Sequence, residues 1–279
     1  MDGAEIIRRH VAHMTRRGLR PTTVTYRIRA LRRLEIHASR SLLHIHLDDL
    51  RAYLDALPDA GYRSAETSHF RGFFKWATIE GYVHEDPTYR LERTRRRKYL
   101  PNPMPVDDVA RALQNPPARI ANAMWLAAYA GLRACDLAPL RREHLMIDAR
   151  VPTVFVEESK GGKPRTVPLA PLLVEALRLP RSGWLFPYHD GRSGHITAHY
   201  MSMLCNAYLH DLGIDHTLHT LRHRFITDCY AVDRDLVVTQ ELAGHESIEM
   251  TRRYTWTDPG AAANTVAQLP DPRRVLTFA

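Results

Sequence analysis

The stretch TRRRKYLPNPMP, residues 94–105, decides how the chain is organised. It combines four consecutive basic residues with three prolines and has no hydrophobic periodicity, which is typical of an extended, positively charged linker. We therefore predict a first domain over residues 1–93, a linker over 94–105 and a second domain that begins at residue 106.

The first domain is predicted to be a bundle of four short helices, because apolar residues recur at helical spacing in four segments. These segments are residues 4–18, a second helix opened by Pro21 and Thr22, Leu47–Leu57, and Ser64–Glu80. In the last segment Phe70, Phe73, Phe74 and Ala77 form the expected core face. Polar faces of the second and fourth helices carry Thr25, Arg29, Arg32, Arg33, Thr67, Arg71 and Lys75. Taken alone, these faces fit solvated helix surfaces as well as a DNA-binding surface.

Positive charge is concentrated in the first part of the chain. Residues 1–103 hold 20 Lys and Arg against 12 Asp and Glu, whereas the remainder holds 19 of each. A basic region beside a neutral one is typical of a module that binds a polyanion, although a solvated basic surface has the same composition.

The second domain is predicted to be mostly helical, with one small antiparallel sheet. Helices are expected near Val106–Leu113 and Ile120–Ala130, the latter ended by Gly131. The runs VPTVFVEES and PRTVPL, joined by KGGK, then predict a hairpin over residues 151–169. The predicted fold class is therefore mainly α, with helices continuing to about Asn264.

Composition excludes several classes of protein. No apolar run approaches the roughly 20 residues that span a bilayer, and the N-terminus lacks the apolar stretch of a secretory signal. We expect no membrane association and a cytoplasmic location. Three widely spaced cysteines match no disulfide or zinc pattern, so we expect buried, reduced thiols at Cys135, Cys205 and Cys229.

Four patches of the second domain carry candidate chemistry: GLRACDL (131–137), SKGGKPRTVPL (159–169), HTLRHRF (219–225) and ELAGHESIEMTRRYTW (241–256). Each patch alone has an ordinary structural explanation. The second is not a P-loop, because Pro164 follows the lysine. In the third, His219 and His223 have the spacing of a zinc pair, but the glutamate of H-E-x-x-H is missing and Arg222 would repel a cation.

Together the patches resemble the tyrosine recombinase family (phage integrase and Xer-like proteins). The resemblance rests on six residues in a fixed order: Arg133, Lys160, His219, Arg222, His245 and Tyr254. It implies that residues 1–93 are a four-helix, SAM-like core-type DNA-binding domain, 106–265 a catalytic domain and 266–279 a C-terminal tail. Asp136 stands where glutamate is commoner, and Ala243 where leucine is commoner. We expect neither to touch a proposed catalytic atom.

The resemblance also implies a reaction. Tyr254 attacks a DNA phosphate and forms a 3′-phosphotyrosyl intermediate, Arg133 and Arg222 clamp the non-bridging oxygens, and Lys160 protonates the departing 5′ oxygen. His219 and His245 donate hydrogen bonds to the phosphate, and His219 is also expected to accept the tyrosine proton. No metal ion or cofactor is expected.

The expected partners are double-stranded DNA carrying specific recombination sites, a homotetramer of this chain on that DNA and an accessory DNA-bending protein. Arg95, Arg96 and Arg97 of the linker are expected to contact the DNA. A phage-type integrase is the leading interpretation, with a Xer-like dimer resolvase as the alternative. Two rivals have no recombinase activity: a catalytically inert DNA-binding regulator on the same fold, and a type IB topoisomerase.

Overall fold

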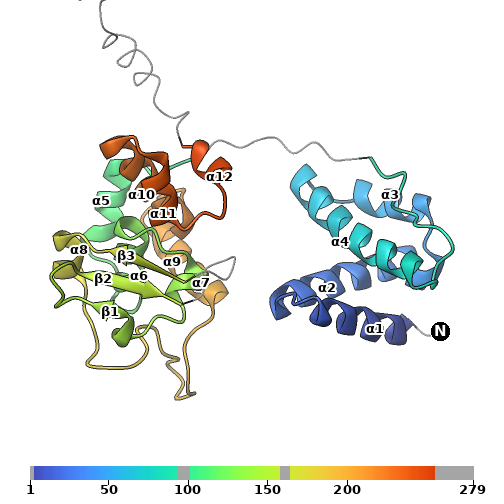
Figure 1. The fold of residues 1–279 in the computed structure, drawn as a ribbon, viewed down its shortest axis with the longest axis horizontal. Coiled ribbons are helices and arrows are strands. Elements are labelled where there is room, and N and C mark those ends of the chain that lie inside the picture. Colours follow the sequence, from blue (N-terminus) through green and yellow to red (C-terminus); the bar gives the residue numbers. More distant parts are fainter. Residues whose placement is uncertain (1–2, 93–100, 158–163, 255–279) are drawn as a thin grey trace, which may run out of the picture. The chain divides into compact units, whose positions relative to one another are not determined.

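The computed structural model describes residues 3–92, 101–157 and 164–254. The chain divides into two compact units, Met1–Lys98 and Tyr99–Ala279 (Figure 1). Each unit has its own apolar core. Several residues singled out from the sequence lie outside the described residues, namely Arg95, Arg96, Arg97, Lys160 and the expected tail 266–279.

The described part of the first unit consists of helices α1 (Gly3–Arg16), α2 (Pro21–Ala38), α3 (Leu47–Asp55) and α4 (Ala60–Ile79), with the 3-10 helix η1 (Leu42–His44) before α3. Pro21 occupies the first position of α2, where the missing N–H costs nothing. Helix α4 begins at Ala60 rather than Ser64, because the carboxylate of Asp59 caps it by accepting hydrogen bonds from the backbone N of Gly61 and Tyr62.

The apolar face predicted for α4 is confirmed: Phe70, Phe73, Phe74 and Ala77 are fully buried. The polar stripe predicted beside it is wrong at Thr67. This side chain is buried, and its hydroxyl donates a hydrogen bond to the carbonyl of Arg63 at 2.7 Å. The helical spacing identified a shared face, but neighbouring helices cover part of that face.

The second unit is built around helix α6 (Ala118–Tyr129), which is buried along most of its length. It packs against α5 (Val106–Gln114), α8 (Pro171–Ala176), α9 (Ala198–Asp211) and α10 (Leu218–Asp233) (Figure 1). The remaining described helices are α7 (Ala134–Leu137), η2 (Arg142–His144), α11 (Leu236–Ala243) and α12 (Ile248–Arg252). Met104, expected in the linker, is fully buried in this core, and its backbone N donates to the carbonyl of Thr220.

A small antiparallel sheet lies in the same unit, with strands in the order β1 (Leu145–Met146), β2 (Thr153–Val156) and β3 (Arg165–Pro168). The predicted hairpin is confirmed as β2 and β3, in which the buried Val154 pairs with the buried Val167. Strand β1 was not predicted, because two residues carry no periodicity. The predicted fold class, mainly α with a small antiparallel sheet, is confirmed.

Two expectations from composition meet the structure here. Among the described residues, no helix is both long and apolar enough to cross a membrane. All three cysteines are free, and Cys205 is buried as expected. Cys135, in the short helix α7, is exposed and Cys229 is only partly buried, so the expectation of three buried thiols is wrong.

Candidate active site

Two turns at glycine residues place Arg133 and His245 at one end of the second unit. Gly131 has a φ of +61° and ends α6, so that the chain turns toward Arg133; a Cβ at this glycine would overlap the ring of Phe225. Gly244 has a φ of +58° and ends α11 immediately before His245; a Cβ there would lie 2.8 Å from the side chain of Arg165. Both positions therefore require glycine.

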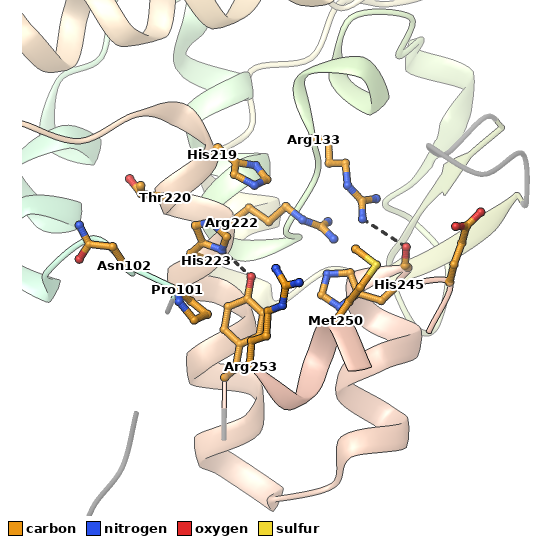
Figure 2. Close-up of a pocket in the computed structure, with 13 residues that line it drawn as sticks. Pro101, Asn102, Arg133, His219, Thr220, Arg222, His223, His245, Met250 and Arg253 are labelled. Atoms are coloured by element: carbon orange, nitrogen blue, oxygen red, sulfur yellow. Dashed lines mark hydrogen bonds between the residues drawn. The ribbon is translucent and has the colours of Figure 1, made fainter. Parts of the chain in front are cut away.

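Side chains from these turns, from α10 and from the residues around α12 surround one pocket of about 710 Å³ (Figure 2). Its lining comprises Pro101, Asn102, Arg133, His219, Thr220, Arg222, His223, Gly244, His245, Glu246, Met250, Arg253 and Tyr254. Five of the six residues in the predicted catalytic set therefore meet at one place. The sixth, Lys160, is outside the described residues, between Glu157 and Pro164.

Arg222 is almost completely buried, with 1% of its surface exposed. Its guanidinium donates hydrogen bonds to the carbonyls of Gly131 and Ala243, so it ties the two glycine turns together. Burial and the nearby guanidiniums of Arg133 and Arg165 lower its pKa to about 9. The group still carries its charge at neutral pH, but no carboxylate among the described residues forms an ion pair with it.

The guanidinium of Arg133 lies beside that of Arg222 (Figure 2) and donates to the carbonyl of Gly244 at 3.3 Å. Its other terminal nitrogen, Nη1, is buried and has no hydrogen-bond partner in the described part of the chain. The carboxylate of Asp136 lies 4.0 Å from that nitrogen, which is too far for a hydrogen bond but close enough for electrostatic attraction. Burial lowers the pKa of Arg133.

The expectation that Asp136 and Ala243 touch no catalytic atom is wrong. Asp136 accepts a hydrogen bond from the backbone N of Arg133 at 3.0 Å and attracts its guanidinium, and the carbonyl of Ala243 accepts from Arg222. The sequence contained a signal for Asp136, because an acidic residue three positions after a helix N-cap is the capping-box position.

Arg165 is a residue that sequence reasoning missed. It lies at the start of β3 and forms a 2.8 Å ion pair with Asp136, in which both side chains are buried. One carboxylate thus serves two guanidiniums, and Arg165 keeps two buried nitrogens without partners among the described residues. The pairing joins the strand that follows segment 158–163 to the turn that holds Arg133.

Tyr254 is also buried, with 5% of its surface exposed. Burial raises its pKa to about 12, although nearby arginines oppose the rise. The phenol oxygen is hydrogen bonded to Nδ1 of His223 (Figure 2), and the ring lies beside that of His245. Nδ1 of His245 is 2.9 Å from the hydroxyl of Thr251. His223 was considered only as a zinc ligand from the sequence, so its contact with the tyrosine was missed.

The two histidines next to Tyr254 are neutral at physiological pH. Burial, together with the charges of Arg222 and Arg133, lowers the pKa of His245 to about 3. The pKa of His223 falls to about 4 through burial and through the neighbouring His219 and Arg222. His219 is more exposed, and its ring centroid is 4.5 Å from that of His223.

The structure separates the DNA-binding candidates of the first unit into three groups. Thr25, Arg29, Arg32 and Lys75 are exposed. Arg33 is half-exposed but donates to the buried carboxylate of Glu66 at 2.6 Å, and Arg71 donates to the carbonyl of Leu91 at 2.6 Å. Thr67, as described above, is buried.

The arrangement favours binding of a phosphate-like anion next to a phenol hydroxyl. Asp136 pairs with the guanidiniums of Arg133 and Arg165, and among the described residues unpartnered N–H groups remain on both arginines. An oxyanion would satisfy such donors and offset the repulsion between the arginines. Within the described ranges, no cluster of three or more His, Cys, Asp or Glu residues could hold a metal ion.

Comparison with known proteins identifies the family of the chain. Residues 104–260 match the model of the phage integrase family. The chain is 31% identical over 247 residues to tyrosine recombinase XerD of Caulobacter vibrioides, covering 78% of this chain and 80% of the relative. It is 29% identical over 237 residues to XerD of Rhizobium meliloti, covering 75% of each chain.

Solved structures share the fold. The structure of a lambda integrase (75–356) dimer bound to a COC′ core site matches with a TM-score of 0.70 at 19% identity, over 88% of this chain and 96% of that one. XerH bound to palindromic difH substrate matches with a TM-score of 0.64 at 19% identity, over 84% and 76%.

Proposed function

The chain belongs to the phage integrase family and is a tyrosine-type site-specific recombinase, and from this premise we propose how its own residues cleave and rejoin DNA. Tyr254 is the nucleophile. Its phenol oxygen attacks a phosphate held in the pocket, giving a 3′-phosphotyrosyl enzyme and a free 5′ hydroxyl. The covalent intermediate stores the energy of the phosphodiester bond, so that rejoining needs no ATP.

The observation that carries this proposal is the position of Tyr254 in one pocket with Arg133 and Arg222, whose positive charges exceed the carboxylates paired with them in the described part of the chain. Arg133 and Arg222 clamp the non-bridging oxygens, whose negative charge grows in the transition state. His219 and His245 line the same pocket and donate hydrogen bonds to the phosphate. Lys160 is proposed as the general acid that protonates the 5′ oxygen.

Exposed residues of the first unit are proposed to bind duplex DNA, namely Thr25, Arg29, Arg32 and Lys75. The linker residues Arg95, Arg96 and Arg97 are proposed to contact the same DNA. Strand exchange through a Holliday junction requires four active sites, so the working form is proposed to be a homotetramer on DNA, assisted by an accessory DNA-bending protein. The tail 266–279 is proposed to dock on a neighbouring protomer.

The test is covalent adduct formation. Purified protein is incubated with a nicked substrate carrying its recombination site, denatured and separated by gel electrophoresis. Tyr254→Phe should bind DNA normally and form no adduct that survives denaturation, because only the attacking hydroxyl is removed. The matched control is Tyr230→Phe, which should form adduct at the wild-type rate. Adduct in the Tyr254→Phe variant would refute the proposal.

A dimer resolvase is the second candidate, because the curated relatives described above are named XerD. The two functions differ in the arrangement of sites. A resolvase recombines two sites on one plasmid, whereas an integrase joins sites on separate molecules. Recombination of both substrate types at equal DNA concentration distinguishes them.

A further inference from the structure

His223 lies on α10 in the position after Arg222, and its Nδ1 is hydrogen bonded to the phenol oxygen of Tyr254 (Figure 2). This side chain is not among the six residues on which the family resemblance rests. We propose that His223 is the general base that accepts the proton of Tyr254 during DNA cleavage. The inference rests on the proposed function, because it assigns a role within the same reaction.

The first argument is contact with the reacting atom. A phenol must lose its proton as it attacks phosphorus, and the acceptor must lie within hydrogen-bonding reach of the oxygen. The imidazole of His223 meets this requirement before any DNA is bound. The role was expected at His219, which lies one turn earlier on α10 and has its ring 4.5 Å from that of His223.

The second argument is the protonation state of the pair. Burial raises the pKa of Tyr254 to about 12, so the hydroxyl keeps its proton at neutral pH. Burial, His219 and Arg222 lower the pKa of His223 to about 4, so the imidazole is neutral. A neutral imidazole has one nitrogen free to accept, and we assign that nitrogen as Nδ1.

The reaction balances within these groups. The bond between Oη of Tyr254 and phosphorus forms while the bond between phosphorus and the 5′ oxygen breaks. The phenol proton moves to Nδ1 of His223 and leaves an imidazolium, and the 5′ oxygen receives a proton from the general acid. In rejoining, the 5′ hydroxyl attacks phosphorus and returns its proton to the general acid, while the bond between phosphorus and Oη of Tyr254 breaks and Tyr254 recovers its proton from His223.

The surroundings explain when this base can act. Burial, His219 and Arg222 all disfavour an imidazolium at His223. A bound DNA phosphate brings negative charge to the same pocket, which offsets the arginines and raises the basicity of the imidazole. Proton removal is thereby restricted to the complex with DNA.

The test pairs two substitutions with two nucleophiles in the full-length chain. His223→Asn keeps an acceptor oxygen near the position of Nδ1 but cannot bind a proton at neutral pH. A fluorinated tyrosine incorporated at position 254 has a more acidic phenol, which needs a base less. The readout is the single-turnover rate of adduct formation on the nicked substrate, with DNA binding and circular dichroism as checks of folding.

His223→Asn should slow cleavage by about 10²–10⁴-fold, the usual scale of general base catalysis, and fluorotyrosine should restore much of that rate. His219→Asn is the matched control: it should slow cleavage by weakening phosphate binding, and fluorotyrosine should not restore it. If His223→Asn does not fold, His223→Gln replaces it in the same comparison.

Three results overturn the inference. Fluorotyrosine could rescue His219→Asn and leave His223→Asn slow, which would return the role to His219. It could rescue neither variant, which would leave His223 as a positioning residue. His223→Asn could also cleave at the wild-type rate. In each case the wild-type chain still forms adduct at Tyr254, so the proposed function stands; loss of that adduct alone would refute the function.

Discussion

The two units of the chain carry positive charge in different ways. The first unit holds the entire formal excess of +8, and its arginines on α2 at positions 29 and 32 are exposed. The second unit is formally neutral, yet Arg133 and Arg222 line its pocket with little exposure to solvent, and Asp136 pairs with Arg133 and Arg165.

Exposed and buried positive charges interact with DNA in different ways. Exposed charges act over about a Debye length, roughly 8–10 Å in physiological salt, and are weakened by added ions. Buried charges are shielded from salt and interact strongly at short range, so they can stabilise a particular arrangement of phosphate oxygens. Net charge therefore describes the attraction of each unit for DNA but not the chemistry of the site.

The largest expected effect tests whether a cation of the second unit acts by chemistry rather than by attraction. Lys160→Ala should slow cleavage of normal DNA by about 10²–10⁴-fold, the scale of general acid catalysis. Because a thiolate leaves without protonation, DNA with sulfur at the bridging 5′ position should restore much of the rate. The measurement is the single-turnover cleavage rate of Lys160→Ala on the normal and on the sulfur-containing DNA.

Lys163→Ala is the control for that experiment, since it removes the same charge three positions away and should show little defect on either substrate. If sulfur at the bridging position restored the cleavage rate of Lys163→Ala and left Lys160→Ala slow, the role of general acid would have been assigned to the wrong lysine. Arg133→Ala should not be rescued by sulfur, because the proposed work of Arg133 is on the non-bridging oxygens.

A somewhat smaller effect compares a buried arginine with an exposed one. Arg222→Lys should lower the cleavage rate at saturating DNA by about 10²–10³-fold, because a lysine cannot reproduce the planar fork that meets two carbonyls and a phosphate. Arg29→Lys should leave that rate unchanged. Equal losses of cleavage rate in both variants would show that the buried and the exposed arginine do not differ in their contribution to the reaction.

Salt dependence gives the next effect. Isolated residues 1–103 should bind DNA with log K falling by roughly 0.9 per log unit of salt for each phosphate contacted, and residues 104–279 should bind more weakly. Fluorescence anisotropy at several salt concentrations measures both slopes. Tighter binding by residues 104–279 at equal salt would contradict the proposed division of labour.

The smallest effect concerns a buried imidazole in the first unit. The ring of His10 packs between Phe73 and Trp76, and neither ring nitrogen has a partner among the described residues. Burial lowers its pKa to about 4, against 6.5 in the unfolded chain. The unfolded chain therefore binds a proton that the folded unit does not, and stability falls as pH drops from about 6.5 to about 4.

His10→Leu should remove that pH dependence, which we expect to be about 1–3 kcal/mol, and should not destabilise residues 1–103 at neutral pH. Urea unfolding at pH 7.5 and pH 5 measures the change, with the exposed His84→Ala as the control. An unchanged difference between the two pH values in His10→Leu would show that another group titrates.

Sequence periodicity predicted what one element determines by itself. The core face of α4 and the hairpin of β2 and β3 follow from spacings of 3.6 and 2 residues. Strand β1 and helix α7 are too short to show a period. Because Gly61 lies in the first turn of α4, the sequence did not show where this helix begins. The capping carboxylate of Asp59 sets its start.

The site was predicted less completely because its contacts join distant elements. His223 meets Tyr254 across 31 positions, and Asp136 meets Arg165 across 29. Spacing along one helix indicates which residues share a face but not which side chain from elsewhere will face them. For the same reason, the spacing of Thr67 on α4 gave no sign that it is covered.

The cross-bonding of the two glycine turns has a consequence for the entropy of DNA binding. Arg133, which follows one turn, donates to the carbonyl of Gly244 in the other, and Arg222 donates back to Gly131. Both long side chains therefore lose their rotational freedom when the unit folds. That loss, up to about 2 kcal/mol for an arginine, does not recur when a phosphate arrives. A phosphate can then bind with little reorganisation of Arg133 and Arg222, so less of the binding free energy is lost in ordering these two side chains.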